Sequence, residues 1–227
     1  MNPRDVCVLI PGYNESRAIA GVVRSVQDLG FPVLVIDDGS TDNMAEKARE
    51  AGAQVLSYGP NQGKGMAIRR GTQWFLEKSS YRAAIFMDSD GQHDPADLSL
   101  FLNALETSDF VVGNRMADPK GMPLVRRLTN RFMSALLSLV ARQWVPDTQC
   151  GYRAATRDAL SKICLKTTRF EIESEMVLEA GRVGSRVASV PVKSLYRGET
   201  SDIRPIRDSA RFFKFLLAYI FRKKTKI

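Results

Sequence analysis

Short apolar segments alternate with segments of helical pattern through the first half of the chain. The apolar segments cover 6–10, 33–36, 54–57, 83–87 and 110–112. The helical patterns between them cover 18–29, 41–51, 63–78 and 95–106. Strands that alternate with helices of about 10–15 residues favour a parallel sheet with helices on both faces. We therefore predict an α/β fold of three layers with a mostly parallel sheet.

The second half has a less regular pattern and longer amphipathic segments. A helix is predicted over 124–142, with an apolar stripe and with Arg127 and Arg131 four residues apart on one face. After the loop PDTQCGYR, helices are predicted over 158–163 and 173–183 and a strand over 187–192. A last helix over about 208–221 contains FFKFLLAYIF and is followed by RKKTK.

The segment DSDGQHDP follows the apolar segment 83–87 directly. Ligands of open α/β sheets bind at the carboxyl ends of the strands, where this segment would lie. Asp88, Asp90 and the amide oxygen of Gln92 form an all-oxygen set that suits Mg²⁺ or Mn²⁺ held together with a substrate's phosphates. The alternative is an acidic turn before a helix, and Asp94 with Pro95 has the pattern of that helix start. Because Asp88 and Asp90 are not needed for such a cap, we favour the metal–diphosphate site.

Two further strands end in polar segments that would reach the same edge. The first strand ends in PGYNE and the second in IDDGSTD. Asp38 can accept a hydrogen bond from a ring N–H of a base, and Tyr13 offers a flat face beside it. The segment NQGKG would bring Lys64 and a helix N-terminus towards a bound phosphate. Together these segments predict a nucleotide-sugar site.

Charge and cysteine content limit the partners and the compartment. Residues 1–114 hold 10 Lys or Arg and 15 Asp or Glu, whereas residues 115–227 hold 23 and 10, so the net charges are −5 and +13. The basic half is expected to face nucleic acid, phosphate groups or an anionic membrane. Three cysteines without a CxxC pattern, and a start that leads straight into a strand, favour a reducing, cytoplasmic compartment.

Six motifs, in order, give the chain a family resemblance. PGYNE, IDDGSTD, NQGKGMAIRRG, DSDGQHDP, VVGNRM and DTQCGYR resemble the family 2 glycosyltransferases of GT-A fold, and most closely the polyprenyl-phosphate (dolichol-phosphate) mannose and glucose synthases. The resemblance extends from Val6 to about Ser201. It implies a GT-A catalytic domain, which we place over 1–207; the amphipathic helix and basic tail predicted from the residues would follow over 208–227. It also implies transfer of a hexose from a GDP- or UDP-sugar to a lipid phosphate, with inversion at the anomeric carbon.

The resemblance also implies roles for individual residues. The nucleotide pocket would consist of Pro11, Tyr13, Glu15, Ile36 and Asp38, and the metal and diphosphate motif of Asp88, Ser89, Asp90 and Gln92. Arg115 and Arg131 would hold phosphate groups near the reacting centre, including that of the acceptor. The chain departs from the family at YRGETSDI, where Asp202 replaces a lysine, so Arg197 or Arg204 is the candidate substitute.

The acceptor is the least constrained part of the prediction. A phosphate acceptor is already an anion and needs guanidinium clamps rather than a strong base, which makes His93 a structural residue. A glycan or protein hydroxyl would need a base, for which Glu171, Glu173 and Glu175 are candidates; the alternative for them is a solvated helix start. A third possibility, a non-enzymatic nucleic-acid binder, rests on the pI of 9.6, but the aromatic residues are not interleaved with basic ones. We therefore expect no nucleic-acid partner.

Membrane contact follows from a lipid acceptor. Neither the apolar stripe of 124–142 nor FFKFLLAYIF reaches the ~20 residues that span a bilayer. Both combine apolar and basic residues, as interfacial helices do. We expect a peripheral enzyme on the cytoplasmic face of the membrane, with a homodimer or a membrane-protein partner left open.

Overall fold

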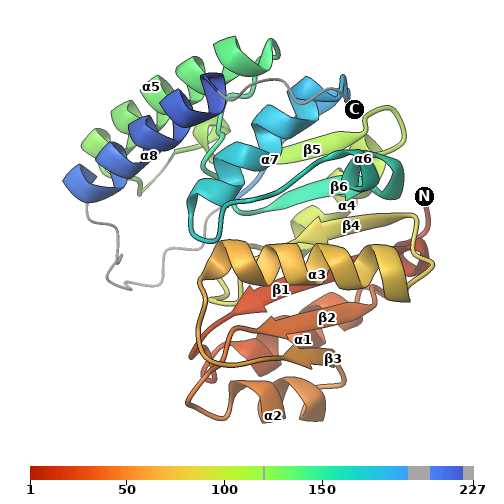
Figure 1. Ribbon diagram of the computed structural model, residues 1–227. Coiled ribbons are helices and arrows are strands. Elements are labelled where there is room, and N and C mark those ends of the chain that lie inside the picture. The colour runs from red at the N-terminus through yellow and green to blue at the C-terminus, as the bar shows by residue number, and fades with distance from the viewer. Residues whose placement is uncertain (120, 194–204, 222–227) are drawn as a thin grey trace. The chain divides into compact units, whose positions relative to one another are not determined.

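A seven-stranded sheet with helices on both faces forms the larger part of the structure (Figure 1). The structure is a computed structural model that describes residues 1–119, 121–193 and 205–221. It comprises two units, Met1–Tyr196 and Arg197–Ile227, which are described separately. The sheet belongs to the first unit.

The strand order across the sheet is β3-β2-β1-β4-β6-β5-β7. The strands are β1 (Val6–Gly12), β2 (Val33–Asp37), β3 (Gln54–Ser57), β4 (Ala83–Phe86), β5 (Phe110–Asn114), β6 (Arg153–Thr156) and β7 (Val187–Pro191). β1 to β4 pair in parallel, as do β5 and β7, whereas β6 runs antiparallel to both β4 and β5. The predicted α/β fold with a mostly parallel sheet is confirmed. β6 was not predicted, because the sequence placed its first residue in a loop.

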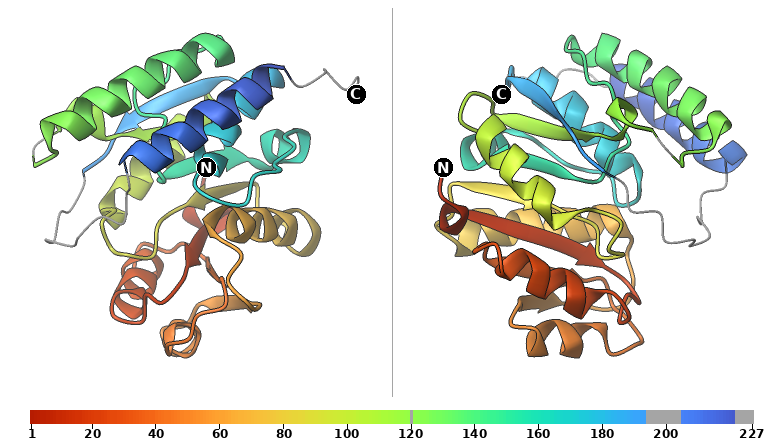
Figure 2. Two further views of the ribbon diagram at one scale, coloured as in Figure 1. Left: turned by 60° about the vertical axis from the view of Figure 1, so that its left-hand side comes forward. Right: turned by 180° about the vertical axis from the view of Figure 1, so that it is seen from behind.

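Seven helices are described in the first unit. They are α1 (Ile19–Gln27), α2 (Met44–Glu50), α3 (Lys64–Lys78), α4 (Leu98–Ala104), α5 (Leu124–Ala141), α6 (Arg157–Lys162) and α7 (Glu171–Arg182). Three short 3₁₀ helices accompany them: η1 (Pro3–Asp5), η2 (Pro95–Asp97) and η3 (Arg115–Ala117). α3, α6 and α7 cover one face of the sheet, and the view from behind shows α1 and α4 on the other (Figure 2). Each predicted helix is present, with ends that differ by a few residues.

Both faces of the central strands are buried, which explains why their sequences are continuously apolar. α3 lies close to the sheet at Gly71, where an added Cβ would stand 2.9 Å from Cδ1 of Ile36. The guanidinium of Arg157 fixes the far end of this helix by donating to the carbonyl oxygens of Phe75, Leu76, Ser79 and Tyr81. α3 is therefore held in place at several points along its length, which fixes the position of the backbone at Lys64 in its first turn.

The second unit contains α8 (Pro205–Ile220), which begins three residues earlier than predicted. Arg197, Asp202, Arg204 and the basic tail 222–226 lie outside the described residues. Across the part of the chain that the structure describes, no helix combines the length and the apolar character needed to span a membrane.

Candidate active site

The carboxyl ends of β1, β2 and β4 bring three of the motifs together. Gly12 at the end of β1 pairs with Asp37 at the end of β2. A Cβ on Gly12 would stand 2.9 Å from both Oγ of Ser89 and Sδ of Met44, so only glycine lets β1 lie this close to the loop after β4. The loops after β1 and β2 also bond each other: the Thr41 N–H donates to Oδ1 of Asn14 at 2.8 Å. The predicted meeting of PGYNE, IDDGSTD and DSDGQHDP at one edge is what the fold produces.

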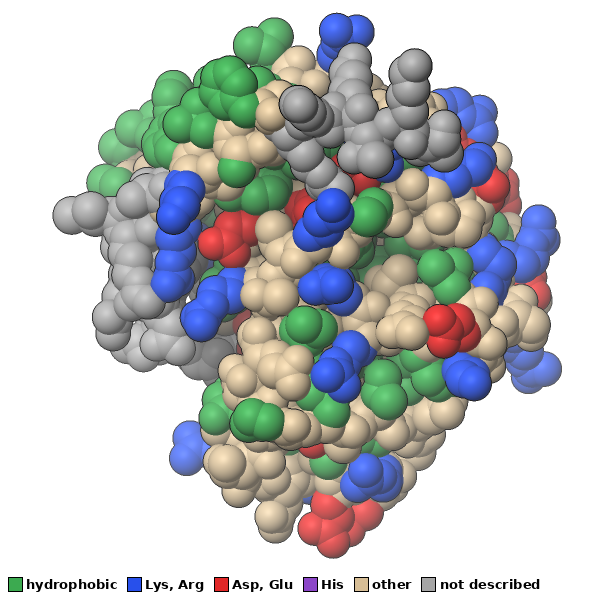
Figure 3. Space-filling model, in the orientation of Figure 1, with side chains coloured by type: hydrophobic (Ala, Val, Ile, Leu, Met, Phe, Trp, Pro, Cys, Tyr) green, Lys and Arg blue, Asp and Glu red, His purple; other side chains and the backbone are tan. Residues whose placement is uncertain are grey.

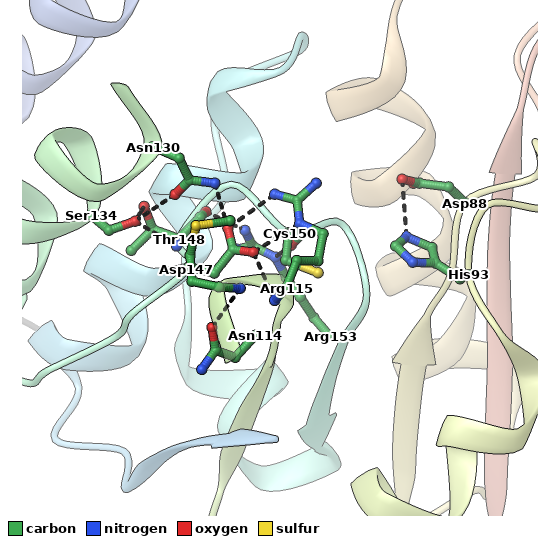
Figure 4. Close-up of polar contacts among 11 residues, drawn as sticks. Asp88, His93, Asn114, Arg115, Asn130, Ser134, Asp147, Thr148, Cys150 and Arg153 are labelled. Atoms are coloured by element: carbon green, nitrogen blue, oxygen red, sulfur yellow. Dashed lines mark hydrogen bonds and ion pairs between the residues drawn. The ribbon is translucent and has the colours of Figure 1, made fainter. Parts of the chain in front are cut away.

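Asp88 is held by two cationic or polar side chains from different elements. Its Oδ1 lies 2.6 Å from Nζ of Lys64, and its Oδ2 lies 3.3 Å from Nε2 of His93. Burial alone would raise the pKa of Asp88, but the charge of Lys64 and the hydrogen bond with His93 outweigh burial and lower it. Asp88 is thus a carboxylate with both oxygens engaged, and Figure 4 shows its side chain facing His93.

A second contact reaches Asp88 from the DTQCGYR segment. Gly151 packs its backbone against the carboxylate, and an added Cβ would stand 2.5 Å from Oδ2 of Asp88. Sequence reasoning did not find this contact. The glycine between Cys150 and Tyr152 was the available signal, since glycine often marks a close approach of the backbone.

Asp90 is the second carboxylate of the predicted metal motif. Its Oδ1 accepts from the backbone N–H of Gln92 at 2.9 Å, which closes a tight turn. Burial and the charge of Asp88 raise the pKa of Asp90, so a nearby cation would relieve an unfavourable charge there. Among the residues that the structure describes, no group of three or more His, Cys, Asp and Glu side chains forms a metal site by itself. The oxygen-only set of Asp88, Asp90 and Gln92 therefore fits Mg²⁺ or Mn²⁺ only if the ion takes further oxygens from a ligand such as a diphosphate.

The residues predicted for the nucleotide pocket differ in how much surface they offer. Tyr13 is 44% exposed, whereas Pro11 and Ile36 are buried within the strands. The carboxylate of Asp38 is also buried, and it accepts from the backbone N–H groups of Gln62 at 2.9 Å and Gly63 at 2.7 Å. Asp38 thus shapes the loop that leads into α3, in addition to the base contact predicted for it.

Lys64 connects this loop to α7. Its ammonium lies 2.7 Å from Oε1 of Glu173 as well as 2.6 Å from Asp88. Glu175, two residues further along α7, accepts from the N–H groups of Lys166 and Thr167 and from the hydroxyl of Thr167. Two of the three glutamates considered as bases therefore have identified structural partners.

His93 packs inside the loop that it belongs to. Its ring lies 4.8 Å from that of Tyr152, and its Nδ1 is buried with no hydrogen-bond partner in the described part of the chain. A ring nitrogen shielded from solvent is poorly placed to exchange protons with an acceptor. This geometry agrees with the structural role expected from the sequence.

Arg115, at the end of β5, is oriented by a buried network (Figure 4). Its Nε and Nη2 donate to the two carboxylate oxygens of Asp147 at 2.8 and 2.9 Å. Asn130 on α5 donates to the same carboxylate at 2.8 Å, and Ser134 continues the network to Thr148. A bidentate pair of this kind fixes the guanidinium plane. Neither Asp147 nor Asn130 was predicted as a site residue; the aspartate in DTQCG was the signal for the first.

Arg131 lies on a different face of α5 from its neighbour Asn130. Asn130 is buried in the network, whereas the side chain of Arg131 is exposed. The two arginines therefore differ in their surroundings: Arg115 is held by Asp147, whereas Arg131 is exposed on the surface. The shared phosphate predicted for them remains a prediction.

α5 also exposes an unusual amount of apolar surface. The exposed fractions are 66% for Leu124, 74% for Val125, 57% for Leu128, 57% for Phe132 and 76% for Leu139. Figure 3 shows hydrophobic side chains gathered at the upper left of this face of the molecule. Clustered exposed apolar side chains mark interaction surfaces more often than single ones do.

Comparisons with known proteins agree with this geometry. Residues 7–164 match the model of the family described as glycosyl transferase family 2. The glycosyltransferase AglJ of Haloferax volcanii is 36% identical over 93% of this chain and 70% of its own length. The UDP-N-acetylglucosamine–dolichyl-phosphate N-acetylglucosaminyltransferase of Methanococcus voltae is 28% identical over 84% of this chain and 86% of its own length.

The fold is shared with a solved structure. The glucosyl-3-phosphoglycerate synthase of Mycobacterium tuberculosis, crystallised with Mn²⁺, UDP and phosphoglyceric acid, superimposes with a TM-score of 0.71. The match covers 95% of this chain and 76% of that one, at 21% identity. The family match and the fold together define a glycosyltransferase of GT-A type. The chain belongs to glycosyl transferase family 2, which argues against the nucleic-acid-binding alternative.

Proposed function

We propose that this enzyme transfers a hexose from a GDP- or UDP-sugar to a polyprenyl phosphate, with inversion and with the help of a divalent cation. The observation that carries the lipid acceptor is α5, which combines exposed apolar side chains with the exposed guanidinium of Arg131. A polyprenyl phosphate combines an apolar chain, which would contact the apolar side chains, with an anionic phosphate, which would contact the guanidinium. The relative from Methanococcus voltae, whose name states a dolichyl-phosphate acceptor, supports the same class.

On the donor side, the proposal assigns binding to the carboxyl edge of the parallel strands. Tyr13 would lie against the base, and Asp38 would accept from its ring N–H while it holds the loop at Gln62 and Gly63. Asp90, with Gln92 and Asp88, would hold a Mg²⁺ or Mn²⁺ together with the diphosphate. When bound, that ion neutralises charge on the leaving nucleotide.

On the acceptor side, the proposal needs no general base. An acceptor phosphate is already an anion at neutral pH, so the protein must only bring it close to the anomeric carbon. Arg115, held rigid by Asp147, would bind this phosphate with a preset orientation, and Arg131 would approach from the surface. The engagement of Glu173 by Lys64 and of Glu175 by the 166–167 loop supports a reaction that uses neither as a base.

Membrane binding is part of the same proposal. The exposed apolar residues of α5 and the apolar pattern of α8 would lie at the surface of an anionic cytoplasmic leaflet, with basic side chains towards the headgroups. Co-sedimentation with vesicles tests it: binding should require anionic lipid, weaken with salt and fall when residues after 207 are removed. Equal sedimentation of the truncated and complete chains would contradict the role of α8.

The decisive experiment is an acceptor panel. The purified enzyme is given Mn²⁺ or Mg²⁺ with a set of UDP- and GDP-sugars, and with three acceptors: a short-chain polyprenyl phosphate, the corresponding polyprenol, and a free oligosaccharide. Transfer to the phosphate alone is expected. Transfer to the oligosaccharide in preference to the phosphate would instead favour a glycan-hydroxyl acceptor.

A further inference from the structure

Lys64 occupies the position of a counter-ion next to the predicted metal site. Its ammonium is within hydrogen-bond distance of Asp88 and of Glu173, at 2.6 and 2.7 Å. The other oxygen of Asp88 faces His93. Of the two carboxylates of the motif, Asp88 is thus neutralised by side chains of the protein itself. Asp90 instead accepts a hydrogen bond from the backbone N–H of Gln92.

We propose that Lys64 is a built-in counter-ion of Asp88, which makes binding of the divalent cation depend on the nucleotide diphosphate. This inference rests on the proposed donor site. A cation arriving alone would meet one carboxylate, Asp90, and the repulsion of the nearby ammonium. A diphosphate adds negative charge and oxygen ligands. The divalent cation and the ammonium of Lys64 can then each interact with negatively charged oxygens. Glu173 is a positioning residue in this scheme, because it holds the ammonium at a fixed distance from the motif.

The backbone around Lys64 is locked before any ligand arrives. A Cβ on Gly63 would stand 2.6 Å from the carbonyl oxygen of Thr168, and one on Gly65 would stand 2.5 Å from its carbonyl carbon. The Thr168 carbonyl also accepts from the N–H of Met66 at 3.1 Å. The first turn of α3 is therefore pressed against the 168–169 segment, which Glu175 holds through the two preceding residues. The ammonium is consequently presented to Asp88 by a rigid support.

A purely structural ion pair and a counter-ion predict different results. If Lys64 only stabilises the fold, its removal weakens cation and nucleotide binding together. If Lys64 neutralises Asp88, its removal frees a carboxylate for the cation and takes away a partner of the diphosphate. The two affinities then shift in opposite directions, and this divergence is the signature of the proposal.

The test is calorimetry with Mn²⁺ alone, with UDP or GDP alone, and with Mn²⁺ at saturating nucleotide. In the natural protein, nucleotide should tighten Mn²⁺ binding within the range of about 5- to 150-fold that is typical of coupled sites. In Lys64→Met, Mn²⁺ alone should bind about fivefold tighter or more, and nucleotide alone should bind more weakly. The factor by which nucleotide tightens Mn²⁺ binding should shrink as much as the affinity for Mn²⁺ alone rises. Glu173→Gln leaves the ammonium to Asp88, so Mn²⁺ alone should bind more weakly than to the natural protein.

Lys78→Met is the matched control, since it removes an exposed lysine from the other end of the same helix, about 21 Å away at the helical rise of ~1.5 Å per residue. It should leave all three affinities unchanged. Thermal melting of each variant checks the fold, and Lys64→Gln replaces Lys64→Met if that variant does not fold. Absence of Mn²⁺ binding to the natural protein with either nucleotide would overturn the donor site and this inference with it. If nucleotide tightens Mn²⁺ binding in the natural protein but Mn²⁺ alone binds no tighter to Lys64→Met, the inference alone would be overturned.

Discussion

Replacing Gly151 by alanine would place a methyl group directly on the carboxylate of Asp88. The new Cβ would stand 2.5 Å from Oδ2, 2.9 Å from Oδ1 and 3.0 Å from Cγ. Ordinary contacts of this kind are about 3.5 Å or longer, so the carboxylate must retreat by about 1 Å. Its bonds to Lys64 and His93 oppose that movement. The backbone at Gly151 is not in the left-handed region, so the effect of Gly151→Ala is steric.

The size of the effect follows from this overlap. Overpacking by one methyl group in a closely packed site costs about 1–3 kcal/mol. If the whole cost falls on the transition state, kcat/KM decreases by about 5- to 150-fold, at about 1.4 kcal/mol for each factor of ten. The same displacement should weaken Mn²⁺-dependent nucleotide binding in calorimetry. Circular dichroism should show an unchanged fold.

Gly21→Ala is the control for this experiment. Gly21 lies on α1 with no atom within 4 Å of an added Cβ. The alanine should leave activity unchanged and raise the free energy of unfolding by about 0.5–1 kcal/mol, since glycine is unfavourable inside a helix. Activity and Mn²⁺-dependent binding of Gly151→Ala equal to those of Gly21→Ala would refute the packing argument.

Three further substitutions test other parts of the site. Asp90→Asn should abolish the enhancement of nucleotide binding by Mn²⁺ while the melting temperature is kept, because the predicted metal ligand loses its charge; calorimetry with and without chelator measures it. Arg131→Lys should raise KM for the polyprenyl phosphate in steady-state kinetics, since lysine keeps the charge and loses the planar fork. Asp147→Asn should lower the free energy of unfolding by about 3–5 kcal/mol at neutral pH, measured with urea, because the largely enclosed guanidinium of Arg115 is left without its counter-charge. Burial acts to raise the pKa of Asp147, but the hydrogen bonds from Arg115 and Asn130 and the charge of Arg115 outweigh burial, so the pKa lies below the ordinary 3.8. The stabilisation from Asp147 is therefore present above pH 3.8 and is lost as the pH falls through the lowered pKa.

Each of these expectations has a result that would count against it. Identical nucleotide affinity in chelator and in Mn²⁺ for the natural protein would remove the reason for the effect of Asp90. Unchanged acceptor kinetics in both Arg131→Lys and Arg131→Ala would make Arg131 an ordinary surface residue. A stability difference between Asp147→Asn and the natural protein that grows below pH 4 would reverse the expected sign.

Sequence patterns predicted the first half of the fold well and the second half less completely. β1, β2 and β4 are continuous apolar segments that end in polar motifs, so their type, direction and common edge could be inferred together. β6 has the sequence RAAT, which offers no β-branched residue before its last position and begins with a charge. Its pairing with β4 and β5, rather than its own preference, makes it a strand.

Arg153 illustrates what a linear pattern leaves out. An arginine at a strand start normally indicates solvent, yet this side chain is buried. Its guanidinium donates to the carbonyl oxygens of Thr148, Cys150 and Glu173. The pair between Lys64 and Glu173 joins residues 109 positions apart in the same way. Contacts of this kind depend on how distant segments fold against each other, and no local spacing encodes them.

The sheet consists of two blocks of sequence that meet along one ladder. β1 to β4, with the loop after β4 as far as Gln92, include the residues proposed to bind the donor; β5, β6, β7 and α5 lie after residue 109, in the block that includes those proposed to bind the acceptor. The ladder between β4 and β6 is made of backbone bonds, which place little demand on side-chain identity. If the proposed sites are right, a recombination crossover between residues 93 and 109 is therefore expected to exchange acceptor preference and to leave donor preference to the other parent. The contacts that such a chimera must inherit intact are those of Gly151 with Asp88 and of Glu173 with Lys64.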